Sequence, residues 1–310
     1  MLTLLLLATP ALTQTIGGGI ETHAEWSGQF SSQSFGKSVA CAGDVDGDGF
    51  DDVIVGAPDA SVGLSNFAGS ATVFSGRTGL ILHLWYGTKA DEARGVSVSG
   101  AGDLNGDGYD DLLVGASGDS LFGLAHPGSV TAYSGFSGTP LFTWHGITDN
   151  DRFGASVANA GDVNQDGTFD ILVGAPFADA GGIDNGSFYV YSGVDGSQIH
   201  HLDGLAAGDT LGWSVSSAGD LNGDGADDFL VGALLASPLG VTPADWSTHI
   251  QVPTPASFIS GVDRPISIAS EEPWPMLVTL TQMARPMSSS VLLLQLVDSL
   301  ALAQCLFTPA

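Results

Sequence analysis

The sequence has 310 residues, of which 34 are acidic and only 7 are basic, so its formal net charge is −27. A chain this acidic cannot neutralise phosphates, which excludes nucleic acid as a partner class. Twenty-nine of the acids are Asp, a residue of tight metal-binding turns, and Gly supplies 44 residues, about twice its usual share. This composition favours a turn-rich, all-β fold over a helical one.

The chain begins with an apolar segment. The run from Met1 to Ala8 is followed by small residues, which resembles the core and cleavage zone of a signal peptide, although no basic residue precedes it. We therefore expect residues 1–20 to be a signal peptide and the protein to be secreted or displayed at the cell surface. The longest later apolar stretch, Val291 to Phe307, contains Asp298, so the sequence predicts no membrane span.

The two cysteines, Cys41 and Cys305, lie far apart in segments of different character. They form neither a CxxC pair nor a framework of evenly spaced cysteines. We expect two free thiols.

An internal repeat dominates the sequence. Asp44, Asp103, Asp162 and Asp220 each open the same kind of segment, at separations of 59, 59 and 58 residues. Ala-Gly precedes each segment, and an apolar run ending in Gly-Ala follows it. Gly-Ser and Ser-Gly pairs in register mark further strands and turns in the first three units. Each period thus holds about four short strands, which is the content of one β-propeller blade.

The Asp segments have the spacing of a calcium loop. Positions 1, 3, 5 and 9 carry side-chain oxygens, position 6 is always Gly, and position 7 varies, as expected if only its carbonyl is used. In that order of positions (1, 3, 5, 7 and 9) the candidate ligands are Asp44, Asp46, Asp48, Phe50 and Asp52; Asp103, Asn105, Asp107, Tyr109 and Asp111; Asp162, Asn164, Asp166, Thr168 and Asp170; and Asp220, Asn222, Asp224, Ala226 and Asp228. The sequence therefore predicts about four calcium sites.

Two neighbouring positions refine this interpretation. Position 12, the bidentate Glu of an EF-hand, is Val in all four units and lies in strand-like runs, so the loops belong to β-hairpins. Position 8 is Asp51, Asp110 and Asp227 but Phe169 in the third unit, which argues against a ligand role there.

The sequence holds no complete catalytic motif. Gly118-Asp119-Ser120-Leu121 matches the short motif of the GDSL esterases, but no His has an Asp three residues before it, so we interpret the match as chance. The sequence has no HExxH, no GxSxG and no phosphate-binding loop. We expect a protein without enzymatic activity that recognises an extracellular protein or glycan. Two alternatives stay open: a carbohydrate-binding, lectin-like propeller, and a propeller-type hydrolase or lyase. Trp26, Trp85 and Trp144 could stack on sugars, but their fixed register favours a place in the core between blades.

The composition changes after Gly240. The last 70 residues hold one Gly and eight of the 14 Pro residues, and the Gly-Ser and Ser-Gly signals that the repeat predicts near residues 244 and 250 are missing from residues 241–250. We interpret residues 241–310 as a Pro-rich tail outside the repeat, either a disordered appendage or the product of a shifted reading frame.

The repeat resembles a known family. Phe35-Gly36 with Gly56-Ala57-Pro58, and Phe153-Gly154 with Gly174-Ala175-Pro176, are similar to the FG-GAP repeats of the integrin alpha-chain N-terminal β-propeller. Units two and four are degenerate, with Arg94-Gly95 and Leu211-Gly212 in the first motif. The resemblance covers residues 25–240 and implies a secreted or surface-exposed, calcium-stabilised propeller for adhesion or recognition. It also implies seven blades, which at 59 residues each need about 413 residues, so we expect an incomplete ring.

Overall fold

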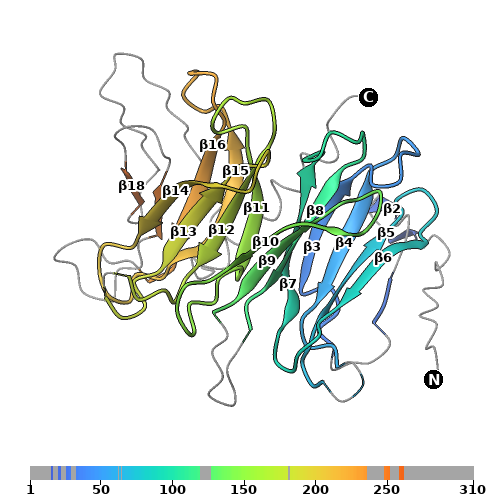
Figure 1. Cartoon of the computed structure of the whole chain (residues 1–310), viewed down its shortest axis with the longest axis horizontal. Coiled ribbons are helices and arrows are strands. Elements are labelled where there is room, and N and C mark those ends of the chain that lie inside the picture. The colour runs from blue at the N-terminus through green and yellow to red at the C-terminus, as the bar shows by residue number, and fades with distance from the viewer. Residues whose placement is uncertain are drawn as a thin grey trace.

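The computed structural model describes residues 15–16, 20–21, 26–28, 33–61, 63, 65–118, 127–180, 182–235, 248–251 and 258–261. Every regular element in these ranges is a β-strand. The short strands β1 (Thr15–Ile16) and β2 (Ile20–Glu21) pair with each other, and the other strands form four separate antiparallel sheets (Figure 1). The predicted all-β fold of repeated blades is confirmed. Most of the predicted signal peptide lies outside the described residues.

Each of the four sheets, here called blades 1 to 4, contains four strands that pair in chain order. The strands are β3 (Ser38–Gly43), β4 (Asp52–Ala57), β5 (Ser70–Phe74) and β6 (Ile81–Tyr86) in blade 1; β7 (Arg94–Gly102), β8 (Asp111–Ala116), β9 (Ser129–Tyr133) and β10 (Pro140–His145) in blade 2; β11 (Ser156–Gly161), β12 (Asp170–Ala175), β13 (Ser187–Tyr191) and β14 (Gln198–Asp203) in blade 3; and β15 (Leu211–Gly219), β16 (Asp228–Ala233), β17 (Thr248–Gln251) and β18 (Phe258–Gly261) in blade 4.

The hydrophobic core lies between the blades. The second strand of each blade is an apolar run covered on both faces, and every residue of β8 and β12 is buried. One core cluster joins blades 1 and 2 through residues such as Ile54 and Val114. Two further clusters join blade 2 to blade 3 and blade 3 to blade 4. This face-to-face packing of sheets is the arrangement of a propeller.

The Trp residues in register belong to these contacts. The Trp85 ring stacks on Tyr133 of the next blade with centroids 4.4 Å apart, and Trp144 stacks on Tyr191 at 5.1 Å. Their indole nitrogens donate to carbonyl oxygens of the following blade, at Gly138 and Gly196. Trp26 makes the equivalent contacts on blade 1, where its ring lies 4.9 Å from Phe74 and its indole nitrogen donates to the Gly79 carbonyl. The interpretation of Trp85 and Trp144 as inter-blade core is confirmed.

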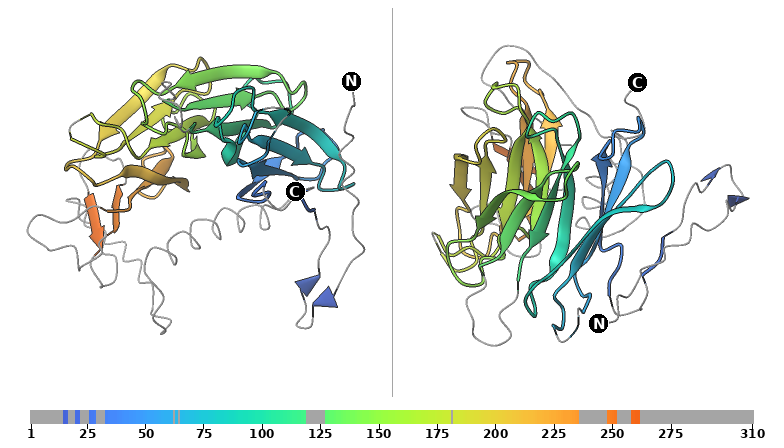
Figure 2. Two further views of the ribbon diagram at one scale, coloured as in Figure 1. Left: turned by 90° about the horizontal axis from the view of Figure 1, so that it is seen from below. Right: turned by 45° about the vertical axis from the view of Figure 1, so that its right-hand side comes forward.

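The blades form an arc and do not close a ring. Figure 2 shows blade 1 and blade 4 at the two ends of the arc. The first strands β3, β7, β11 and β15 contact one another in succession and form the inner side of the arc. The expected incomplete ring is therefore the arrangement of the described residues.

Blade 4 takes two strands from beyond Gly240. β17 pairs with β16 at Val231 and Gln251, and β18 pairs with β17. Strand pairing uses backbone groups, so it does not need the Gly-Ser and Ser-Gly signals of the first three units. Apart from β17 and β18, the predicted tail at 241–310 lies outside the described residues, and its boundary stays a prediction.

Cys41 corrects one expectation. Its sulfur forms a disulfide, so it is not the free thiol expected from the sequence. Separation along the chain placed the two cysteines in unlike segments, but it sets no limit on their distance in the folded protein. Cys305 lies outside the described residues.

Candidate metal centre: the Asp loops

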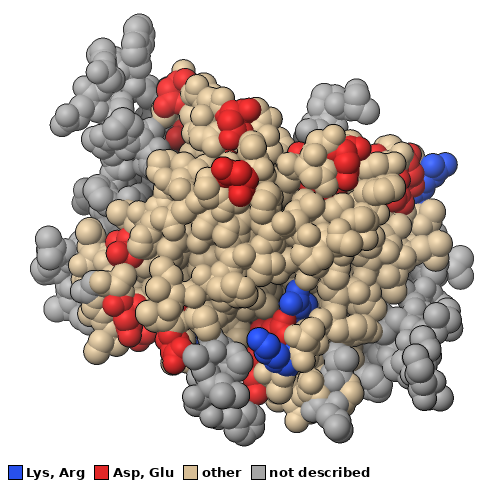
Figure 3. All heavy atoms as spheres, viewed as in Figure 1, with Lys and Arg blue, Asp and Glu red and all other residues tan. Residues whose placement is uncertain are grey.

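Each Asp loop joins the first two strands of its blade and follows a bulge glycine. In blade 1 the register of β3 and β4 shifts at Gly43, whose φ is +75°; the equivalents Gly102, Gly161 and Gly219 have φ of +68°, +80° and +63°. Glycine adopts this left-handed conformation without strain, and the bulge directs the chain into the loop. Clusters of carboxylates lie along the upper edge of the molecule in Figure 3, where basic side chains are few.

The position-1 carboxylate organises the loop. Asp44 accepts backbone N–H groups of Gly47, Asp48 and Gly49 at 2.8, 3.0 and 3.0 Å. The same three acceptor contacts recur in the loops of Asp103 and Asp220. The chain therefore wraps around this carboxylate in loops of different blades.

Positions 3 and 5 point their oxygens inward through Asx turns. Asp46 accepts the N–H of Asp48 at 3.1 Å, and Asp48 accepts the N–H of Phe50 at 3.1 Å. One carboxylate oxygen from each of Asp44, Asp46 and Asp48 lies within 4.8 Å of the others. The structure thus brings three of the predicted ligands of the first loop together. In the other loops position 3 is Asn, whose amide oxygen makes the same turn at 2.8 to 2.9 Å.

The position-9 carboxylate is buried under the loop. Asp52 accepts the N–H of Val45 at 2.9 Å and the N–H of Gly76, in the β5–β6 hairpin, at 2.9 Å. Asp111 and Asp170 make the equivalent two contacts, and Asp228 makes the first of them. This residue therefore ties the loop to the opposite hairpin of its own blade.

Burial raises the pKa of these position-9 carboxyl groups. The pKa of Asp52 rises to about 6, mainly because burial disfavours the charged form. The hydrogen bonds from the N–H groups of Gly76 and Val45 lower this pKa, and the charges of Asp46 and Asp44 raise it further. Burial likewise raises the pKa of Asp111 and Asp170 to about 6, and raises that of Asp228. No described Lys or Arg forms an ion pair with a loop carboxylate, so the partners of these carboxylates among the described residues are backbone N–H groups.

These residues fit a hard cation. Carboxylate, amide and carbonyl oxygens at positions 1, 3, 5, 7 and 9 form the donor set that calcium prefers, and the charge of the ion would offset the repulsion within the loop. A bound ion would hold the oxygen-bearing positions of the loop together and so stabilise its conformation. The predicted position-7 residues occupy the expected place before the second strand, and only their carbonyls would take part.

The sequence did not reveal the role of position 8. The Asp110 carboxylate of blade 2 accepts the N–H of Asp44 in blade 1 at 2.8 Å, and its own N–H donates to the Asp44 carbonyl at 3.1 Å. Asp227 makes the same pair of bonds to Asp162, at 2.9 and 3.1 Å. We call this arrangement the inter-blade Asp contact. It is missing between blades 2 and 3, where Phe169 packs over Gly102 instead. The recurrence of Asp in three of four units was the signal for it.

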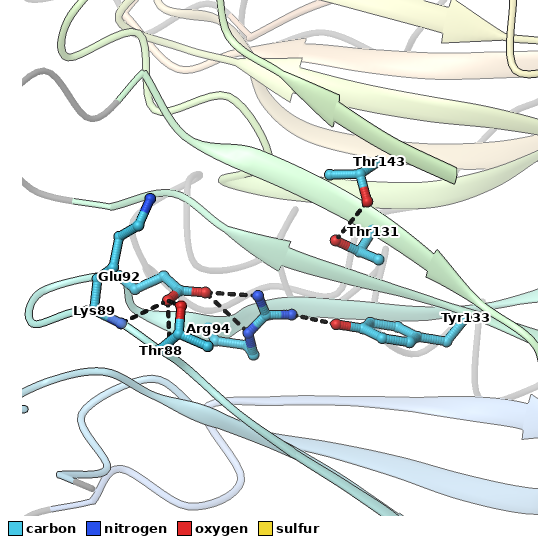
Figure 4. A network of polar contacts seen from close by, with 7 residues as sticks. All are labelled: Thr88, Lys89, Glu92, Arg94, Thr131, Tyr133 and Thr143. Carbon is cyan, nitrogen blue, oxygen red and sulfur yellow. Dashed lines mark hydrogen bonds and ion pairs between the residues drawn. The ribbon is translucent and has the colours of Figure 1, made fainter. Parts of the chain in front are cut away.

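The degenerate first motif of blade 2 is compensated by a polar network (Figure 4). Arg94 stands where blade 3 has the buried Phe153, and its guanidinium forms an ion pair with Glu92 at 2.6 Å and a hydrogen bond to Tyr133. Glu92 also accepts the N–H groups of Thr88 and Lys89. Burial alone raises the pKa of Glu92, but Arg94 and these N–H groups outweigh it and lower the pKa below its usual value.

One exposed Trp lies outside the repeat register. Trp213 follows the degenerate motif of blade 4 and is 36% exposed. Its ring contacts Phe177 of blade 3 edge-on, with centroids 6.0 Å apart, and the Arg152 guanidinium lies 4.5 Å from the Phe177 centroid. The described residues therefore include an aromatic surface next to a cation at the junction of blades 3 and 4.

The fold and loops define a blade-repeat protein of the propeller class. The FG-GAP repeat family matches residues 35–74, 94–133, 153–191 and 211–244, so the chain belongs to the FG-GAP repeat proteins. Each match begins at the first motif of a blade. The resemblance to this family is confirmed.

Named relatives agree with this assignment. Integrin alpha-5 of Xenopus laevis is 33% identical over 221 residues, which cover 66% of this chain and 20% of the relative. Integrin alpha-V of Gallus gallus is 31% identical over 222 residues, with 67% and 21% covered. Phosphatidylinositol-glycan-specific phospholipase D of Bos taurus is 37% identical over 151 residues, with 43% and 18% covered. The chain therefore spans about a fifth of the length of these relatives. Among the described residues there is no helix of the length and apolarity needed to cross a membrane.

Proposed function

We propose that this chain is an extracellular recognition protein, without enzymatic activity, whose blades are stabilised by calcium in four Asp loops. Its ligand is an extracellular protein or glycan, and its location is secreted or cell-surface. The observation that carries the proposal is the convergence of the Asp44, Asp46 and Asp48 carboxylates in the first loop, without a paired Lys or Arg among the described residues. The other three loops share its spacing and its backbone hydrogen bonds. The similarity to integrin alpha chains supports the extracellular setting.

Calcium at these loops would contribute substantially to stability. Extracellular calcium modules often have dissociation constants of about 0.1 to 1 mM, so roughly 1 mM calcium adds about 0.4 to 1.4 kcal/mol per site. Four sites together contribute on the order of 2 to 6 kcal/mol, which is comparable with the whole stability of a domain. The bound ions would add eight positive charges, and the chain would still carry −19 from its −27.

Calorimetric titration of calcium into chelator-stripped full-length chain tests this function. We expect four sites and a higher melting temperature in calcium. Asp107→Ala removes a position-5 oxygen and should reduce the count to three, whereas Asp149→Ala, an exposed Asp outside the loops, should leave four. Finding no more than one site in the unmodified chain would refute the proposal.

A glycan is the second candidate ligand class, and Trp213 favours it. An exposed indole beside an aromatic ring and a guanidinium is a surface on which a sugar ring stacks. We expect glycan binding, measured on an array, to be lost in Trp213→Ala and kept in Leu235→Ala, which removes another exposed apolar side chain. An array without hits for the unmodified chain removes this candidate and leaves a protein ligand.

A further inference from the structure

Three Asn-Gly dipeptides occur in the sequence, and two of them lie in the Asp loops. Asn105-Gly106 and Asn222-Gly223 occupy positions 3 and 4 of the second and fourth loops, and Asn185-Gly186 directly precedes β13. An Asn side chain carries an electrophilic amide carbon, and the backbone nitrogen of the next residue can attack it. Glycine at that next residue has no side chain to obstruct the attack and has a flexible backbone. The Asn-Gly dipeptides are therefore the places where this chain loses a side-chain amide most readily.

The surroundings of the two loop dipeptides leave room for this reaction. Asn105 and Gly106 are exposed, and a Cβ placed on Gly106 would meet nothing within 4 Å. The same holds for Asn222 and Gly223 in the fourth loop. Water therefore reaches both dipeptides, and no neighbouring group blocks a local change of the backbone.

Two hydrogen bonds activate the reacting groups of each loop dipeptide. The Asn105 side-chain oxygen accepts the N–H of Asp107 at 2.9 Å, and this donor stabilises the negative charge that develops on the oxygen during attack. The Gly106 N–H donates at 2.8 Å to the Asp103 carboxylate, which can accept the proton that the nitrogen loses. The equivalent distances in the fourth loop are 2.8 and 2.6 Å. Each loop thus holds an oxyanion donor and a proton acceptor beside one Asn-Gly bond.

The third dipeptide has a setting that prevents the reaction. Asn185 is 0% exposed, and its amide nitrogen donates to the Gly204 carbonyl at 2.8 Å. The Gly186 N–H donates to the Ala178 carbonyl at 3.0 Å, and a Cβ on Gly186 would lie 2.3 Å from backbone atoms of Leu211. The amide that must leave and the nitrogen that must attack are therefore both held inside the blade.

The third Asp loop is a natural control. Asn164 occupies position 3 there, is exposed, and accepts the N–H of Asp166 at 2.9 Å in the same turn. Its amide nitrogen also donates to the Asp166 carboxylate at 2.8 Å, on the surface. The next residue is Gln165, whose side chain hinders the approach of its own nitrogen to the amide carbon. Gln165 has a φ of +60°, a conformation that Gly adopts without strain, so a Gly at this position fits the loop.

We propose that Asn105 and Asn222 are sites of spontaneous deamidation. The Gly nitrogen bonds to the amide carbon and loses its proton, while the bond from that carbon to the side-chain nitrogen breaks. The proton ends on the departing nitrogen, which leaves as ammonia, and a cyclic succinimide remains. Water, the one co-reactant, then opens the succinimide at either carbonyl and gives Asp or isoaspartate. The proposal stands independently of the proposed function, because it uses only groups of the folded loops.

The two products affect the loop differently. Asp at position 3 reproduces the first loop, where Asp46 makes the same turn to the Asp48 N–H at 3.1 Å. Isoaspartate routes the backbone through the side chain, which lengthens the loop by one CH₂ and turns the oxygen that accepts the Asp107 N–H into a backbone carbonyl. Each event adds one negative charge, so conversion of both sites takes the formal charge from −27 to −29. Ageing thus produces chains with altered second and fourth loops.

The test is peptide mapping by mass spectrometry after incubation of the folded full chain in chelator at neutral pH. We expect the conversion of amide to carboxyl at Asn105 and Asn222, with isoaspartate detected by enzymatic methylation, and no conversion at Asn164 or Asn185 over the same period. Gln165→Gly should add Asn164 as a third site, whereas the matched variant Gln165→Ala should not. Circular dichroism checks that both variants are folded.

The unfolded chain supplies the reference for reactivity. In denaturant we expect all three Asn-Gly dipeptides to convert, so that protection of Asn185 is a property of the fold. A folded chain that converts at neither Asn105 nor Asn222 would overturn the proposal, and so would conversion at Asn185 as fast as at these two sites. Failure of Gln165→Gly to convert at Asn164 would overturn the role given to glycine.

A parallel incubation in calcium connects the modification with the proposed function, and this comparison alone rests on it. An ion held by the oxygens of Asp103 and Asn105 would fix the amide and occupy the carboxylate that accepts the Gly106 proton. Conversion at Asn105 and Asn222 should therefore be slower in calcium than in chelator. Equal rates at both sites would contradict calcium binding by these two loops and would leave the deamidation sites established.

Discussion

The inter-blade Asp contact predicts a loss of stability when Asp110 is replaced by Ala. The substitution removes the acceptor of the 2.8 Å bond from the Asp44 N–H, while the backbone bond from the Asp110 N–H to the Asp44 carbonyl stays. A hydrogen bond to a charged group contributes about 1.5 to 3 kcal/mol. Burial, together with the charges of Asp51 and Asp44, raises the pKa of Asp110 and so opposes its charged form, which offsets part of this contribution. We therefore expect a loss of about 1 to 2 kcal/mol.

The assay is thermal and chemical denaturation, in calcium and in chelator. With an unfolding entropy of about 2.1 cal/mol/K per residue over 310 residues, the loss corresponds to a fall in melting temperature of about 1.5 to 3 °C. Asp227→Ala should behave like Asp110→Ala because it removes the equivalent bond to Asp162. Asp149→Ala, at an exposed site, should change stability by less than about 0.5 kcal/mol.

Blade 3 supplies an internal check on this reasoning. Phe169 occupies position 8 there, so the Asp103 N–H has no carboxylate partner from the next blade. If the contact with blade 1 is what stabilises the fold, removing the Asp110 carboxylate should cost more free energy of unfolding than removing an exposed carboxylate such as that of Asp149. If Asp110→Ala and Asp149→Ala lose the same stability, the inter-blade Asp contact contributes nothing and the reasoning is refuted.

Three further substitutions have definite expected outcomes. Asp111→Asn places an amide NH₂ opposite the backbone N–H of either Leu104 or Gly135, which loses its acceptor. The free energy of unfolding in chelator should therefore fall by about 1 to 3 kcal/mol, and an unchanged denaturation midpoint contradicts this. Phe153→Ala empties a site that is 1% exposed and should lose about 3 to 5 kcal/mol; a loss below about 1 kcal/mol in denaturant would show that Phe153 is not core. Glu92→Gln should lose stability at neutral pH. Because the folded pKa of Glu92 is lowered, its contribution is present above the unfolded pKa of 4.5 and disappears as pH falls through the folded pKa, so the two melting curves should converge in acid; a constant difference contradicts this.

The sequence predicted those features that repeat with a fixed period. The spacing of side-chain oxygens located the loops, because a tight turn with Gly at position 6 brings positions 1, 3 and 5 together, and Asp44, Asp46 and Asp48 do converge. The apolar runs after the loops located the buried second strands. Both signals are local, since they depend on residues within about ten positions of one another.

Features that depend on contacts between distant segments were not predictable in this way. The role of Asp110 depends on a residue 66 positions away, and the strands β17 and β18 pair through backbone groups that no side-chain pattern marks. The disulfide of Cys41 was missed for the same reason. The compensation of Arg94 by Glu92 could have been found, since an acid two residues before an Arg at a core position indicates a buried pair.

The loops and the blade contacts are physically one system. Asp44 uses its carboxylate to wrap the first loop and its backbone N–H and carbonyl to hold Asp110 of the next blade. Asp110 lies between Tyr109, whose carbonyl is a candidate ligand, and Asp111, whose buried carboxylate closes the second loop. A cation that rigidifies one loop therefore also fixes the groups that bind the neighbouring blade. Phe169 breaks this linkage between blades 2 and 3, so calcium should couple blade 1 to blade 2 and blade 3 to blade 4 more strongly than it couples the two pairs to each other.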